Sequence, residues 1–148
     1  MIKRSVFIVV LFLLASCAPA MQEHVMDHSE HKLMKVHADK DVLNLHDYTL
    51  TFERPEITAG KETQFAFTLM KNGQPLPLQQ LHGALMHVII VSKDLEHFDH
   101  LHPDIPEPGR YVVKHTFDDA KDYRVWVEYM SDDLEHIVDF DFIVQPAS

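Results

Sequence analysis

The pattern that most limits the fold of this chain is an alternation of apolar and polar residues with a period of two. It begins at Val42 and returns in residues 62–69, 111–117, 123–129 and 137–144, and no part of this region has a long 3.6-residue apolar rhythm. Side chains of a β-strand point to alternate faces of a sheet, so each segment is predicted to be a strand with one buried face. We therefore expect this region to be all-β.

Turn and loop signals separate the predicted strands. Pro55 ends the first run, Asn72-Gly73 is typical of a tight hairpin turn, and the proline-rich stretch 103–109 indicates a loop. Residues 84–91 are almost entirely apolar, which predicts a strand buried on both faces. About seven short strands in this length predict a β-sandwich of immunoglobulin-like type, with a closed barrel as the alternative.

Residues 1–16 have the features of a lipoprotein signal peptide. Lys3 and Arg4 precede an unbroken apolar run from Val6 to Leu14, which is shorter than the roughly 20 residues that a membrane-spanning helix needs. The run ends in Leu14-Ala15-Ser16-Cys17, which looks like a lipobox, where the cysteine receives a lipid and the chain is cut before it. An ordinary signal peptide with a chance cysteine is the alternative.

Lipidation also accounts for the cysteine content. Cys17 is the only cysteine, so the exported part has no internal disulfide although its compartment would permit one. We expect a protein of the bacterial cell envelope, attached to the membrane through lipid on Cys17 and facing the periplasm or the outside. Ala18 follows the cysteine where inner-membrane retention uses Asp, which favours the outer membrane if the cell is Gram-negative.

The composition favours cations as ligands. The chain has 13 basic and 23 acidic side chains, a formal charge of −10, and 12 histidines. An acidic surface repels nucleic acid, which we exclude as a partner, while histidine is the commonest metal-ligating side chain.

We divide the exported part into a tether and a domain. Residues 17–40 are polar, lack aromatic side chains and read as a flexible tether, and residues 41–148 form the predicted sandwich domain. The tether contains closely spaced thioether and imidazole side chains, both of which can bind metals, at Met21, His24, Met26, His28, His31, Met34 and His37. A loose metal-collecting segment and a solvated stalk explain this composition equally well.

The most informative histidines lie between residues 82 and 103. His100 and His102 are separated by one residue, so in extended chain both imidazoles lie on the same side and can reach one metal, and Pro103 favours the extended conformation. His87 interrupts an apolar strand, and a buried imidazole needs a partner, which a metal, a backbone carbonyl or a carboxylate such as that of Asp94 can provide.

These residues carry a resemblance to a known family. Met86-His87, Asp94-Leu95, Phe98, His100, His102-Pro103 and Gly109-Tyr111 resemble the signature of the YtkA-like, copper-resistance-associated domains of bacterial exported proteins. The resemblance covers roughly residues 42–144 and is specific only in its central third. It implies an immunoglobulin-like sandwich and a link to copper or other heavy metals.

The candidate metal ligands follow from these patterns. They are His82, His87, His97, His100 and His102, with Met86, Met130 and His136 as lower-ranked candidates. Met86 is expected to point away from His87, and His115 alternates with apolar neighbours as a core residue does.

We expect a lipoprotein that binds a transition metal, copper in the first place and zinc as the competitor, and that buffers the metal or passes it to a protein partner. The alternative is a non-metal interaction module of an envelope complex. We expect no enzymatic activity, because the chain has no nucleophile elbow, His-Glu-x-x-His motif or phosphate loop.

Overall fold

The structure is a computed structural model and describes residues 32–45 and 47–148. Within these residues eleven strands form two sheets. The strands are β1 (Lys32–Ala38), β2 (Val42–Leu45), β3 (Tyr48–Glu53), β4 (Glu62–Lys71), β5 (Gln74–Pro75), β6 (Met86–Ser92), β7 (Phe98–Leu101), β8 (Asp104–Glu107), β9 (Arg110–Thr116), β10 (Asp122–Ser131) and β11 (Leu134–Ile143). The prediction of an all-β domain is confirmed.

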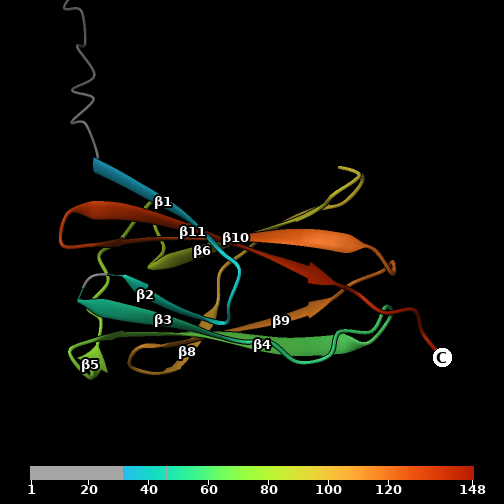
Figure 1. The fold of residues 1–148 in the computed structure, drawn as a ribbon, viewed down its shortest axis with the longest axis horizontal. Helices are drawn as coiled ribbons and strands as arrows, with labels where there is room; N and C mark the ends of the chain where they lie inside the picture. Colours follow the sequence, from blue (N-terminus) through green and yellow to red (C-terminus); the bar gives the residue numbers. More distant parts are fainter. Residues whose placement is uncertain (1–31, 46) are drawn as a thin grey trace, which may run out of the picture.

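The two sheets face each other as the layers of a sandwich (Figure 1). Sheet A has the order β1-β11-β10-β6-β7, and sheet B has the order β2-β3-β4-β9-β8 with β5 paired to β4. Within them, the runs β3-β4-β9-β8 and β6-β10-β11 have the strand order of an immunoglobulin-type sandwich, whose two sheets are ABED and CFG, and β7 adds a further strand beside β6. All pairs are antiparallel except β1 with β11.

Aromatic side chains from both sheets fill the space between the layers. Phe52 stacks on Phe67 with ring centroids 4.9 Å apart, and Phe140 of the opposite sheet lies 4.8 Å from Phe52. All three rings are at most 2% exposed. Burial of each ring contributes about 1.5–3 kcal/mol, which makes this cluster a main source of stability.

Turn residues are placed as the sequence predicts. Asn72 and Gly73 have positive φ angles of 51° and 76° and connect β4 to β5 as a two-residue turn. Positive φ at both central positions is the requirement of the type I′ hairpin turn, which Asn-Gly meets well.

Four strands were not predicted from the sequence, and β1 corrects the boundary of the tether. Residues 32–38 lie inside the range assigned to the tether, yet they pair in parallel with β11. β5, β7 and β8 have only two to four residues each, and β8 lies within the stretch predicted as a loop from its prolines. Such short edge strands carry too few alternations for a pattern to show, and proline is tolerated at a sheet edge.

The predicted signal peptide, Cys17 and the first part of the tether lie outside the described residues. Across residues 32–45 and 47–148, the structure contains no helix with the length and apolar character that a membrane span requires.

Candidate metal centre

His87 lies on the outer face of sheet A but is almost completely buried. It alternates along β6 with Met86 and Val88, which belong to the core between the sheets, so its own side chain points away from that core. His87 is nevertheless only 4% exposed. Residues that precede and follow β6 must therefore cover it.

A tight turn just before β6 provides part of this cover. Leu81 and Ala84 exchange two backbone hydrogen bonds of 2.8 and 3.1 Å around His82 and Gly83, both of which have positive φ angles. This is the geometry of a type I′ turn, and the glycine adopts it without strain. The turn places the carbonyl oxygen of Leu81 2.7 Å from Nε2 of His87.

The contact with Leu81 determines which nitrogen of His87 is available to a ligand. A carbonyl oxygen only accepts hydrogen bonds, so Nε2 of His87 carries the hydrogen and donates it. The lone pair of the neutral ring is then on Nδ1. A backbone carbonyl in this position is the kind of partner that orients metal-ligating histidines, because it fixes both ring orientation and tautomer.

His100 and His102 approach this free lone pair from the neighbouring strand. β7 pairs with β6 so that His100 lies beside Ile89, on the same face as His87, and His102 follows one residue after the end of β7. Nε2 of His100 lies 2.8 Å from Nδ1 of His87, and Nε2 of His102 lies 3.0 Å from the same atom. The predicted same-side arrangement of the His-x-His pair is confirmed.

The three residues form a cluster that we call the His triad (His87, His100 and His102). Their ligand nitrogens all lie within 4.8 Å of one another. Two nitrogens bound to one tetrahedral ion at about 2.0–2.1 Å are about 3.3 Å apart, so the two short distances in the triad are close to those of a metal site.

The hydrogen-bond balance of the His triad also favours a cation. Two Nε2 atoms point at the single lone pair of Nδ1, which accepts one good hydrogen bond. One imidazole of the metal-free triad is therefore poorly satisfied. A metal ion that accepts a lone pair from each of the three rings removes the conflict. His100 and His102 are exposed, so an ion reaches the site from solvent.

The comparison with protein families covers the region that contains the His triad. Residues 40–146 match the model of a family described as Domain of unknown function (DUF8832). The chain belongs to this family. The comparisons with curated proteins and with solved structures found no match.

Two other predicted ligands of the DUF8832 region lie near the His triad without joining it. The ring of His82 lies 6.3 Å from that of His87, at the exposed tip of the turn and next to the carbonyl that binds Nε2 of His87. Met86 is 1% exposed and belongs to the core, as its position beside His87 on the strand predicts. His82 is not grouped with the three ligand nitrogens.

The remaining candidates lie elsewhere. Nε2 of His97 is 2.8 Å from a carboxylate oxygen of Asp119, so this histidine has a hydrogen-bond partner outside the triad. Met130 is 9% exposed and lies in the strand β10. His136 is 1% exposed on β11, and Cys17 lies outside the described residues.

His136 is a core histidine with aromatic partners. The hydroxyl of Tyr48 lies 2.9 Å from its Nδ1 and 3.0 Å from its Nε2, and Tyr129 stacks on the ring at 4.8 Å. Burial lowers the pKa of His136 below its ordinary value, and the backbone at Ser131 and the charge of Asp132 only partly oppose this shift. Tyrosine side chains thus surround the ring of His136, and His136 is not grouped with the three ligand nitrogens of the His triad.

Sequence reasoning missed the turn that orients the site. The carbonyl of Leu81 carries no signal in the side-chain pattern, although His82-Gly83 before a strand is compatible with a tight turn. Asp94, named as a possible partner of His87, binds Ser92 and Lys121 instead, and its pKa is lowered mainly by Lys121.

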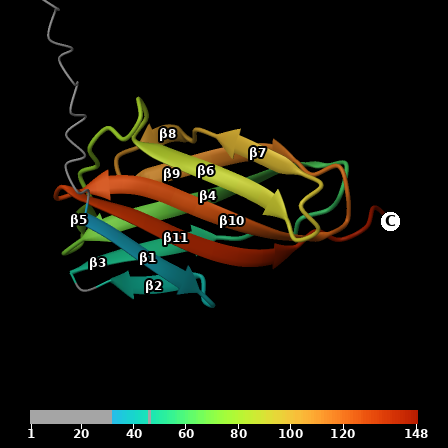
Figure 2. The ribbon, with the colours of Figure 1, turned by 90° about the horizontal axis from the view of Figure 1, so that it is seen from above.

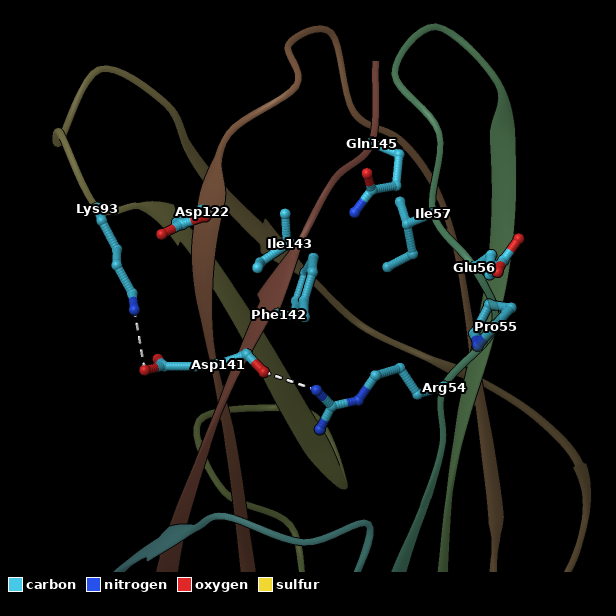
Figure 3. Close-up of a pocket in the computed structure, with 10 residues that line it drawn as sticks. All are labelled: Arg54, Pro55, Glu56, Ile57, Lys93, Asp122, Asp141, Phe142, Ile143 and Gln145. Carbon is cyan, nitrogen blue, oxygen red and sulfur yellow. Dashed lines mark hydrogen bonds and ion pairs between the residues drawn. The ribbon is translucent and has the colours of Figure 1, made fainter. Parts of the chain in front are cut away.

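A hollow of about 490 Å³ near the opposite ends of the strands offers a second concave surface (Figure 3). Lys93 binds the carboxylate of Asp141 at 3.0 Å, and Arg54 donates a 2.7 Å hydrogen bond to the Asp141 carbonyl. Arg124 also binds the Asp141 carboxylate, and Arg124 and Lys93 lower the pKa of Asp141 to about 2. The charges of Lys93, Arg54 and Asp141 in this hollow are therefore engaged by other residues of the protein.

Proposed function

We propose that this protein binds a transition metal, copper in the first place, at the His triad, and that it buffers the metal or transfers it to a partner protein at the bacterial cell envelope. The observation that carries the proposal is the convergence of three imidazole nitrogens, two of which lie 2.8 and 3.0 Å from the third. The carbonyl of Leu81 supports the proposal, because it orients His87 for ligation through Nδ1.

Three arguments favour copper. Among divalent first-row metals, a site of nitrogen ligands binds copper most tightly, and it binds zinc less tightly than copper. Three neutral imidazoles also suit Cu(I), which accepts low coordination numbers. The resemblance to YtkA-like, copper-resistance-associated domains includes His87, His100 and His102.

The proposed location and role are linked. The lipobox around Cys17 supports attachment to the envelope, where a metal-binding lipoprotein meets ions that enter the cell. His100 and His102 are both exposed, and an ion held by three protein ligands has room for one more. An accessible ion with an exchangeable fourth ligand is suited to transfer, whereas structural metal sites are closed.

Metal titration of the full chain tests the proposal. Trp126 is the only tryptophan and lies beside Ile89, which in turn lies beside His100. Two strand spacings of about 4.8 Å place it close enough for bound Cu(II) to quench its fluorescence. We expect saturable binding of one copper ion per chain, with zinc as a weaker competitor that does not quench.

A pair of double variants provides the control. His100→Ala/His102→Ala should abolish the saturable binding, while His97→Ala/His115→Ala removes two histidines outside the triad and should leave it unchanged. Wild-type-like copper uptake by His100→Ala/His102→Ala would reject the proposal.

The second candidate function is that of an interaction module without metal. Two exposed apolar side chains favour an interaction surface. Leu95, between β6 and β7, is 80% exposed, and Phe98, the first residue of β7, is 67% exposed. Large exposed apolar side chains often mark contact surfaces. A protein that retains no copper or zinc in the titration above, and forms an envelope complex that is lost in Leu95→Ser/Phe98→Ser, would establish this function instead.

A further inference from the structure

Carboxylates on the outer face of sheet A differ in whether they have partners. Asp139 and Asp141 are bound by histidine, lysine and arginine side chains. Glu128 on β10 and Glu135 on β11 also alternate with core residues and point to this outer face. Within the described part of the chain, neither glutamate carboxylate has a hydrogen bond or an ion pair, so both are free to turn toward a cation.

Of these two glutamates, Glu128 lies beside the His triad. β10 pairs with β6 so that Glu128 is directly opposite His87, and the Cβ atoms of such a pair are about 4.5–5.5 Å apart. Glu135 is on the next strand and two residues away from Ile137, the partner of Glu128. With the usual spacings of a sheet, Glu135 lies roughly 12 Å from His87. Figure 2 shows β10 between β6 and β11 in sheet A.

The distance from β10 to a bound ion determines how Glu128 can act on it. Nδ1 of His87 faces His100 and His102, on the side of β6 where β7 lies. An ion held by the three rings therefore lies between β6 and β7, at about one and a half strand spacings, or about 7 Å, from β10. A glutamate side chain covers only part of this separation, and Glu128 is not grouped with the three ligand nitrogens.

The fourth ligand of the ion can bridge the remaining distance. His100 and His102 are exposed, so solvent supplies water to the position that the three rings leave open. A water bound at about 2.1 Å and hydrogen-bonded to a carboxylate at about 2.6 Å spans the distance that the Glu128 side chain leaves. A charged acceptor makes this hydrogen bond roughly twice as strong as a neutral one does.

We propose that Glu128 selects divalent ions at the His triad: its carboxylate accepts a hydrogen bond from the water in the fourth position and favours Cu(II) and Zn(II) over Cu(I). The proposal rests on the proposed function of the triad. The attraction between a carboxylate and an ion is proportional to the charge of the ion, so it is twice as large for a divalent ion as for Cu(I). Cu(I) also accepts three ligands and needs no such water. Glu128 is thus a positioning residue that acts through the fourth ligand.

Titration of the full chain with Cu(II), Zn(II) and Cu(I), each added alone, tests the proposal in the variant Glu128→Gln. This substitution keeps the size of the side chain and removes its charge. We expect the affinity for Cu(II) and for Zn(II) to fall by about tenfold, at the low end of the losses seen when a partner of the metal ligands is removed. The affinity for Cu(I) should fall by only about threefold, because the attraction is half as large.

The reduction potential of bound copper gives a second readout, which a merely structural role of Glu128 would not move. A threefold greater loss of Cu(II) affinity than of Cu(I) affinity raises the potential, because the oxidised state is weakened more. With 59 mV for each factor of ten in a one-electron couple, the expected rise in Glu128→Gln is about 30 mV, measured by voltammetry of the copper-loaded chain.

Glu135→Gln is the matched control. It removes the same charge from the same face of sheet A, but at a distance from His87 where salt at about 0.1 M screens most of the interaction. All three affinities and the reduction potential should therefore remain close to those of the wild type.

The outcomes separate the two proposals. Wild-type affinities and potential in Glu128→Gln, an equal loss for Cu(I) and Cu(II), or an equal effect of Glu135→Gln would each overturn the role of Glu128 while leaving the triad intact. Copper binding that is unaffected by His100→Ala/His102→Ala would overturn the proposed function itself.

Discussion

His87 and His136 have the same side chain and nearly the same exposure, 4% and 1%, yet their surroundings prepare them for different tasks. His136 points into the sandwich, where the hydroxyl of Tyr48 and the face of Tyr129 surround it. His87 points outward beneath a turn, where a carbonyl binds one nitrogen and two imidazoles face the other. Burial therefore does not distinguish a structural histidine from a candidate ligand, whereas the atoms around the ring do.

The largest difference between His87 and His136 is expected in their effect on copper affinity. His87→Phe should lower copper affinity by at least about 100-fold, because loss of an outer-shell partner alone typically costs 10–100-fold. His136→Phe should leave the affinity unchanged. Isothermal titration with copper measures both, and an equal loss in the two variants would remove the distinction.

Stability without metal should show the opposite order. His136→Ala leaves a cavity in the core and should lower the free energy of unfolding by about 2–4 kcal/mol. His102→Ala removes an exposed side chain and should change it by no more than about 0.5 kcal/mol. Chemical denaturation in the presence of a chelator gives both values. A large loss in His102→Ala would mean that the triad supports the fold.

A smaller effect on the stability of the metal-free protein is expected when the pH is lowered. Burial lowers the folded-state pKa of both His136 and His115, so below about pH 6.5 the unfolded chain binds protons that the folded chain does not. The stability of the metal-free protein should therefore fall as the pH decreases from 7 through 6.5, until the folded-state pKa values are reached. In His136→Phe the fall measured by denaturation should be smaller, and an unchanged slope would show that His136 does not contribute.

The sequence predicted the fold well where a strand is long and has one buried face. β4, β9, β10 and β11 follow the alternation of their residues, because burial on one side of a sheet imposes the period of two. β1 and β7 escaped prediction because edge strands are short or half exposed, so little of their pattern depends on the core.

The candidate site could be predicted only in part. The spacing of His100 and His102 indicates two ligands, because a one-residue separation is a local property of extended chain. The role of His87 depends on the register between β6 and β7. The partners that engage His97 and His136 are Asp119 and Tyr48, which lie 22 and 88 residues away in sequence. Such pairings are products of the tertiary fold.

The edge position of β1 has a consequence for the movement of the chain. β1 touches sheet A only through β11, and Ala38 is the only one of its residues 33–38 that is buried. Its backbone amides should therefore exchange hydrogen with solvent sooner than those of β10, through local openings that leave the core intact. An opening of the whole strand would free seven residues, or about 23 Å of extended chain, and expose the edge of β11 that β1 covers.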